Sequence, residues 1–303
     1  MVSSRQAADA GYTREQIRER LADGRWERVR YGQYAERLDL SHLSPWDREV
    51  VRHRLLVHAA MNAMRPESAV VSHHSALVMH GVPVWRADLA EVQLTRTSGR
   101  SELKAGVRHH RGVLDLRDTT EMDGRAVTSI ARALVETAGR SSFEAAVVSA
   151  DAALRRPDVD PEELRRLIAV TENWPGGPTI RAALAFADPR SESVGESRLR
   201  VLMHNEGLPV PVPQAEFEDD DGFVGRVDFH FEDENTLVEF DGLLKYADGS
   251  REALIREKDR EDRLRALGFE VVRTTWADLV HPARTAFRIR QGFARARGSR
   301  LVG

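Results

Sequence analysis

Four acidic residues in the last third of the chain are of the type and spacing that a metal-dependent hydrolase uses. Asp228, Glu239 and Asp241 lie in two short apolar stretches, and Glu196 precedes them. Two carboxylates about 4 Å apart repel by about 4 kcal/mol at an effective dielectric constant near 20. A divalent cation removes this repulsion, and oxygen ligands without histidine or cysteine favour Mg2+ or Mn2+. Such an ion binds phosphate and activates water, so these residues predict phosphodiester hydrolysis.

Two strands must bring these carboxylates together. The pattern predicts strands at 214–217, 223–231 and 236–241. Val227, Phe229 and Phe231 recur with a period of two, which places Asp228 on the opposite face of the second strand. Glu239 and Asp241 share a face of the third strand. If the two strands pair through their short turn, Asp228 and Glu239 converge on one side of the sheet. A polar sheet face without a metal is the alternative interpretation.

A helix from Ser193 to about Glu206 is predicted to carry Glu196 at the edge of its apolar stripe. A carboxylate at that position is costly unless something binds it. The alternative is structural, because Ser193 and Glu196 have the spacing of a capping box.

This order of elements resembles the PD-(D/E)XK restriction-endonuclease pattern. Val227-Asp228-Phe229 and Leu237-Val238-Glu239-Phe240-Asp241-Gly242 are similar to its very-short-patch-repair-like branch, which continues, as here, with a charged helix (251–267) and a strand (268–273). The resemblance covers about residues 191–280. It implies a restriction-endonuclease-like α/β/α domain in which Asp228 and Glu239 bind Mg2+ (or Mn2+) and Glu196 completes the site.

The chain departs from this pattern at one position. Asp241 stands two residues after Glu239, where the archetype of the family has lysine. Lys245 and Lys258 are two of only three lysines in the chain, and either is a candidate to orient the attacking water. Asp241 would then be an additional ligand or acid. For Lys258, an ordinary ion pair on a solvated helix is the alternative.

The first 34 residues predict two short helices and a hairpin. Capping boxes start the helices, Ser3 with Gln6 and Thr13 with Gln16, and a ribbon turns near Gly32. These elements suggest a winged helix-turn-helix, with the second helix in the major groove of DNA. A helical hairpin that contacts protein is the alternative. The residues expected to contact DNA are Arg14, Arg18, Arg25, Arg28 and Arg30.

The front of the chain resembles the N-terminal winged helix of AbiEi-type antitoxins of type IV toxin–antitoxin systems. The resemblance is carried by Arg5 to Gly11 and by Gly24 to Tyr34, and more loosely by Ser72-His-His-Ser-Ala-Leu77 with His80. In that family the N-terminal domain binds promoter DNA and the rest neutralises a toxin. The resemblance therefore implies DNA and a cognate toxin protein as partners.

Residues 41–190 contain predicted helices (45–64, 130–138 and 161–170) and predicted strands (92–95 and 107–110) but no recognisable catalytic motif. The pairs His73-His74 and His109-His110 lack the spacing and the intervening glutamate of a zinc protease. We expect these histidines to be packed or solvated rather than metal ligands. At the end of the chain, a run of six arginines from Arg284 to Arg300 contains no acid. It would either follow DNA phosphates or form an exposed helix end.

Composition limits the function without identifying it. The chain has 303 residues, a formal charge of −3 and no cysteine. This excludes disulfides and cysteine-ligated metals, and any contact with nucleic acid must be local. The start of the chain is charged and no apolar run is long enough to span a membrane, so we expect a cytoplasmic protein with no membrane partner.

Together these features predict an α/β and α+β multidomain protein. Its parts are an N-terminal winged helix-turn-helix (1–40), an α+β, antitoxin-like middle region (41–188) and a C-terminal restriction-endonuclease-like α/β/α domain (189–303). The leading hypothesis is a Mg2+-dependent DNA endonuclease with an N-terminal DNA-binding domain. The alternative is a non-enzymatic, antitoxin-like transcriptional regulator whose nuclease fold is degenerate.

Overall fold

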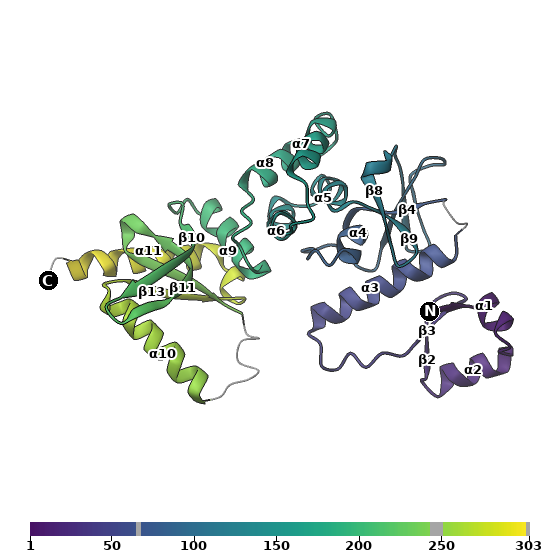
Figure 1. The fold of residues 1–303 in the computed structure, drawn as a ribbon, viewed down its shortest axis with the longest axis horizontal. Helices are drawn as coiled ribbons and strands as arrows, with labels where there is room; N and C mark the ends of the chain where they lie inside the picture. The colour runs from purple at the N-terminus through teal and green to yellow at the C-terminus, as the bar shows by residue number, and fades with distance from the viewer. Residues whose placement is uncertain (65–67, 243–250, 301–303) are drawn as a thin grey trace. The chain divides into compact units, whose positions relative to one another are not determined.

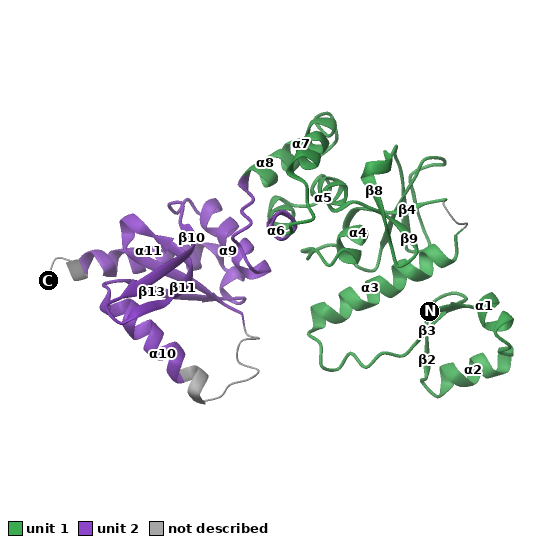
Figure 2. Ribbon diagram, in the orientation of Figure 1, with its two compact units in different colours: residues 1–149, 156–185 green, residues 150–155, 186–303 purple. Residues whose placement is uncertain are grey.

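The protein is a mixed α/β chain with three sheets (Figure 1). The computed structural model describes residues 1–64, 68–242 and 251–300, and within the last range the side chains of 255–298. The chain divides into two compact units, coloured separately in Figure 2. Unit 1 comprises residues 1–149 and 156–185, and unit 2 comprises 150–155 and 186–303. None of the helices in the described ranges has the length and apolarity needed to cross a bilayer.

Unit 1 begins with a small sheet and two helices. The sheet has the order β1-β3-β2 and is built from β1 (Val2–Ser3), β2 (Trp26–Arg30) and β3 (Gln33–Glu36). Helices α1 (Ser4–Asp9) and α2 (Arg14–Ala22) pack Ala7 and Ile17 against Trp26 and Tyr34. Both predicted capping boxes are confirmed, since in each case the hydroxyl and the glutamine exchange hydrogen bonds with the backbone.

The rest of unit 1 is built on a six-stranded mixed sheet of order β6-β7-β5-β4-β9-β8. The predicted strands at 92–95 and 107–110 and the predicted helices at 130–138 and 161–170 are confirmed. The strands are β4 (Val70–Val71), β5 (Val92–Arg96), β6 (Glu102–Lys104), β7 (Val107–Arg111), β8 (Thr119–Met122) and β9 (Arg125–Thr128). The helices are α3 (Pro45–Asn62), α4 (His73–Met79), α5 (Ile130–Ala138), α6 (Phe143–Leu154), α7 (Pro161–Val170) and α8 (Gly177–Phe186). The residues of α6 from 150 onward belong to unit 2.

His53 lies in the core of unit 1 as a neutral ring. Its Nδ1 lies 2.7 Å from the carbonyl oxygen of Leu89 and must donate to it, so Nε2 accepts from the hydroxyl of Ser75 at 2.8 Å. The Ser75 hydroxyl in turn accepts from the backbone N–H of Gln93. This chain of bonds fixes one tautomer. Burial lowers the pKa of His53 to about 4.

We therefore expect an NMR titration of the His53 ring in the full chain to show a pKa near 4 instead of 6.5. Because the folded-state pKa is lowered, the neutral ring stabilises unit 1 above pH 6.5, and this contribution is lost as the pH falls toward 4. Titration of the His53 ring near pH 6.5 would contradict the assigned network.

Unit 2 is a four-stranded sheet with helices on both faces. The strand order is β10-β11-β12-β13, antiparallel except that β12 and β13 are parallel. Helices α9 and α11 cover one face, through Leu199, Ile289 and Phe293, and α10 covers the other through Leu264. The elements are α9 (Val194–Asn205), β10 (Val212–Asp219), β11 (Gly222–Phe231), β12 (Thr236–Asp241), α10 (Arg251–Ala266), β13 (Glu270–Thr275) and α11 (Pro282–Arg300).

The expected alternation along β11 is interrupted at Asp228. Phe229 and Phe231 pack with α9 and α11, as expected of one face, but Val227 packs with Leu264 of α10 on the other. The prediction that Val227, Phe229 and Phe231 share a face is therefore wrong. The interruption lies opposite Gln214 of β10, whose φ of 55° departs from extended geometry. A local irregularity of this kind turns a side chain out of the regular pleat.

Candidate active site

The Asp228 carboxylate lies between strands β11 and β12 instead of on a face of the sheet. The two strands pair from Phe231 back to Phe229, which is opposite Val238. Beyond that point, Oδ2 of Asp228 accepts a hydrogen bond of 2.7 Å from the backbone N–H of Phe240. The side chain thus takes the place of a ladder bond where the two strands separate. This is a local reason for an acidic residue at this position.

Glu196 reaches the same end of the sheet from the first turn of α9. The Ser193 hydroxyl accepts from the N–H of Glu196, as predicted, but the Glu196 side chain accepts from Glu192 instead of completing a box with Ser193. The helix lies unusually close to β12. A Cβ on Gly195 would stand 1.9 Å from the ring of Phe240, so only glycine permits this approach.

Gln214 links Glu196 to Asp228. Its Nε2 donates to Oε2 of Glu196 at 2.9 Å and lies 3.5 Å from Oδ1 of Asp228. Both oxygens are therefore within reach of one nitrogen, although they come from a helix and a strand that are distant in sequence. Sequence reasoning missed Gln214. The one available signal was an amide side chain opposite Asp228 in the neighbouring strand.

Glu239 is directed toward α10. Its Oε1 accepts from Arg260 at 2.7 Å, and Oε2 lies 3.8 Å from Arg273 of β13. Glu257 binds the same two guanidinium groups, at 2.8 Å from Arg260 and 2.6 Å from Arg273. Two arginines thus neutralise two carboxylates on the face of the sheet that α10 covers. Sequence reasoning also missed Arg260, although it lies one helical turn before buried Leu264.

Electrostatics set Glu239 apart from an ordinary surface acid. Burial raises the pKa of its carboxyl, and Arg260 and Arg273 oppose this rise. For Arg260, burial lowers the pKa of the guanidinium, but the ion pairs with Glu257 and Glu239 outweigh this and raise it. Glu239 is therefore a buried carboxylate whose charge depends on a nearby cation.

This raised pKa predicts a pH dependence. The folded state binds the Glu239 proton more tightly than the unfolded state, so the resulting stabilisation is present below about pH 4.5 and lost as the pH rises through the folded-state pKa. The free energy of local opening of β12 in Glu239→Gln, minus that in the wild type, should therefore increase between pH 4 and pH 7. The slope should not exceed about 1.4 kcal/mol per pH unit. Hydrogen exchange of the β12 amides measures it, and a difference that is constant with pH would contradict the prediction.

The other predicted residues are distributed as follows. Asp241 ends β12 opposite Thr275 and is half-buried. Lys258 is exposed, and Arg260 is the α10 cation that contacts Glu239. Lys245 lies outside the described residues. Asp228 and Glu196 are thus brought together through Gln214, whereas Glu239 binds Arg260.

A divalent cation would need oxygens that are now engaged with nitrogen donors. Glu196 and Asp228 supply hard oxygen ligands on either side of the Gln214 amide, which suits Mg2+. Glu239 would have to exchange Arg260 for the ion. Among the described residues, no group of three acidic or histidine side chains has a spacing suited to a metal ion. Glu196 and Asp228 are therefore the two proposed ligands that the structure brings near one another, whereas Arg260 of α10 holds Glu239.

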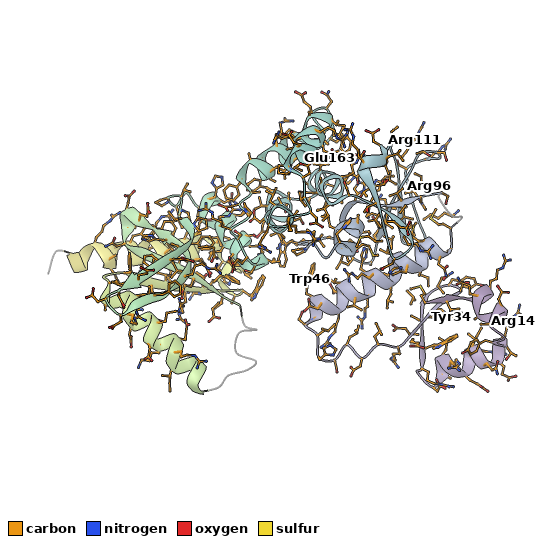
Figure 3. The ribbon with its side chains drawn as sticks, in the orientation of Figure 1. Arg14, Tyr34, Trp46, Arg96, Arg111 and Glu163 are labelled. Carbon is orange, nitrogen blue, oxygen red and sulfur yellow. The ribbon has the colours of Figure 1, made fainter. Side chains whose placement is uncertain are left out.

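The arginines predicted to bind DNA differ in their environments. Arg14 and Arg18 lie one turn apart on the exposed side of α2, and Arg28 is exposed on β2 (Figure 3 labels Arg14). Arg25 pairs with Asp23 at 2.6 Å, and that pair lowers the pKa of the Asp23 carboxyl. Arg30 donates to the carbonyl oxygen of Ala105 at 2.7 Å, which ties the hairpin to the next part of unit 1. Arg14, Arg18, Arg25 and Arg28 are thus exposed, and of these Arg25 is paired with an acid.

The arginines near the C-terminus make contacts within unit 2. Arg295 pairs with Glu270 and Arg297 with Glu234, while Arg288 pairs with Asp278. These ion pairs favour the interpretation of that run as a helix end instead of a surface that follows DNA phosphates.

Comparison with known proteins adds relatives but no activity. No protein-family model matches the chain. Two uncharacterized proteins of Mycobacterium tuberculosis, from strains CDC 1551 and H37Rv, are each 33% identical to it over 177 residues. The match covers 58% of this chain and 65% of each relative, so the chain spans slightly less than two thirds of their length.

Proposed function

We propose that the chain is a metal-dependent DNA endonuclease with an N-terminal DNA-binding segment. The main support is the arrangement around Asp228, in which Gln214 joins the carboxylates of Glu196 from α9 and Asp228 from β11 where β11 and β12 separate. The order α9-β10-β11-β12-α10-β13, with β12 parallel to β13, agrees with the restriction-endonuclease-like resemblance of the sequence. A cytoplasmic location, where DNA is accessible, is part of the proposal.

In this proposal, Asp228 and Glu196 hold Mg2+ or Mn2+, and Glu239 joins them when Arg260 releases it. The bound ion would lower the pKa of a water molecule and neutralise charge on the phosphate. The residues of the chain would position the phosphodiester and the water. Arg260 and Arg273, freed in part from Glu239, would remain close enough to neutralise phosphate oxygens. Arg14, Arg18 and Arg28 would hold the duplex through its backbone.

Nicking of a supercoiled plasmid by the full chain tests this proposal. Nicking that requires Mg2+ or Mn2+ and stops when EDTA removes the metal is the expected result. No nicking with either metal, at protein concentrations that shift DNA in a gel, would exclude the endonuclease.

One observation favours a second candidate, a non-enzymatic DNA-binding transcriptional regulator of the antitoxin type. Arg260 already supplies Glu239 with the positive charge that a metal would bring, and Asp241 stands where the archetype has lysine. A site stabilised by its own arginine needs no ion to fold. In that case the chain would bind promoter DNA and a cognate toxin protein without cutting DNA. Binding without nicking in the same assays would support this candidate.

A further inference from the structure

Unit 1 contains a cavity of about 730 Å³ that the proposed nuclease chemistry does not use. This volume is typical of small-molecule sites in proteins. Its lining residues come from α4, β5, β7, α5 and the segment after α7. Those that carry the argument are His73, His110, Arg111, Glu136, Arg140 and Trp174.

The floor of the cavity is charged but internally neutralised. Glu136 accepts from Arg132 at 2.8 Å, and Arg132 also donates to Asp118 at 3.1 Å. All three side chains are buried. Asp118 accepts in addition from Arg166 of α7. Because these charges are paired with one another, the floor is rigid and offers a ligand little net charge.

Two neutral histidine rings form one wall of the cavity. His73 and His110 stack with their centroids 3.8 Å apart and their planes at 18°. Nε2 of His110 lies 2.6 Å from the side-chain oxygen of Gln93 and donates to it. Burial lowers the pKa of His110 to about 4 and that of His73 well below its usual value. The wall is therefore aromatic and uncharged at neutral pH, and Trp174 adds another flat ring to the lining.

The mouth of the cavity is positive. Arg111 ends β7 and Arg140 follows α5, and both side chains are exposed (Figure 3 labels Arg111). In the described ranges of the chain, neither forms a salt bridge with an acid. After burial, the charge of Arg140 is the largest factor that lowers the pKa of His110, and it also lowers that of His73, so its field extends into the cavity. Both arginines line the cavity, so their guanidinium groups are available to an anion there.

The backbone at His73 is strained in a way that maintains this wall. Its φ is 52°, in the left-handed region that residues other than glycine rarely adopt. The Glu136 carboxylate accepts from the His73 N–H at 3.3 Å and so holds this conformation. Strain that is held by surrounding groups is common at ligand sites.

The same residues do not form a hydrolase. Ser72, His73 and Glu136 are the residue types of a catalytic triad, but both the Ser72 hydroxyl and the Glu136 carboxylate contact Nδ1 of the ring, at 3.0 and 3.5 Å. A relay needs them on opposite nitrogens. The cavity is therefore suited to binding and not to acyl transfer.

We propose that this cavity binds a nucleoside monophosphate, with its phosphate on Arg111 and Arg140 and its base against the aromatic wall. The neutral rings suit a planar base, and the unpaired arginines at the mouth suit a dianion. This site lies in unit 1 and is separate from the carboxylates of unit 2.

Isothermal titration calorimetry of the full chain with AMP, GMP, CMP and UMP tests the proposal, with EDTA present so that no metal site can bind phosphate. At least one nucleotide should bind with a Kd below about 1 mM. Inorganic phosphate and the matching nucleoside should each bind at least about tenfold more weakly, because the first lacks the base and the second lacks the phosphate. The absence of binding by all four nucleotides, or equal binding of inorganic phosphate, would overturn the proposal.

Variants then locate the site. Arg140→Ala should weaken nucleotide binding by about tenfold or more, the expected effect of losing a charge-assisted hydrogen bond. The matched control is Arg181→Ala, which removes an exposed arginine of α8 that does not line the cavity and should leave the Kd unchanged. Asp228→Asn should also leave the Kd unchanged, so this result is independent of the nuclease proposal. Equal losses in Arg140→Ala and Arg181→Ala, or in Asp228→Asn, would place binding elsewhere and overturn the assignment.

Discussion

Replacement of Asp228 by asparagine should lower the rate of Mg2+-dependent plasmid nicking by about 100-fold or more. Loss of a carboxylate ligand weakens both the binding of the ion and the charge it places on phosphate, and each factor of ten corresponds to about 1.4 kcal/mol of transition-state stabilisation. Asparagine retains an oxygen that can accept from the N–H of Phe240, so the connection between β11 and β12 should persist. The measurement is the initial rate of conversion of supercoiled to nicked plasmid.

The matched control for Asp228 is another acid of the same unit. Asp233 is exposed in the turn between β11 and β12, and Asp233→Asn should nick at the rate of the wild type. Hydrogen exchange of the β11 and β12 amides in both variants establishes that the sheet is intact. If Asp228→Asn nicks as fast as the wild type, the observed activity does not come from this site.

Replacement of Arg200 by methionine should destabilise unit 2 by about 3–5 kcal/mol. Arg200 of α9 donates to both carboxylate oxygens of Asp151, at 2.8 and 2.7 Å, and to the carbonyl oxygen of Phe186. Asp151 is 1% exposed, and burial raises the pKa of its carboxyl while Arg200 opposes the rise. Without Arg200, the buried carboxylate must remain uncompensated or take up a proton. Hydrogen exchange of β12 and β13 measures the loss.

A second variant separates loss of the pair from loss of packing. Arg200→Met combined with Asp151→Asn removes both charges and should recover part of the loss, since the uncompensated carboxylate is gone. The matched control is Arg297→Met, which removes an arginine 67% exposed and paired with Glu234. It should cost less than about 1 kcal/mol. Similar small losses in Arg200→Met and Arg297→Met would show that the buried pair stabilises unit 2 no more than the exposed pair does.

Local structure followed closely from local sequence. The capping boxes at Ser3 and Thr13 start helices where predicted, and β12 has the predicted bounds. Such signals act over a few residues, through backbone hydrogen bonds and alternation of apolar side chains, and are therefore readable without knowledge of the fold. The sequence also identified the acidic residues around the end of β11 and β12.

The residues that contact those acids could not be predicted from the sequence. Period-two alternation fails at Asp228, because an irregular backbone at Gln214 of the neighbouring strand lies opposite it. Arg260 reaches Glu239 only because α10 packs over that face of the sheet, and no spacing along the chain encodes this contact. The cavity in unit 1 likewise depends on His73 and His110, which come together from separate elements.

The sequence by itself determined where most helices and strands begin and which carboxylates are candidates for chemistry, because both depend on residue type and short-range spacing. The tertiary structure alone decided which nitrogen faces each of these carboxylates, and which two histidines stack on each other in the unit 1 cavity. The physical reason is that hydrogen bonds, ion pairs and burial act between atoms within a few ångströms of each other, whatever the number of residues that separates them along the chain.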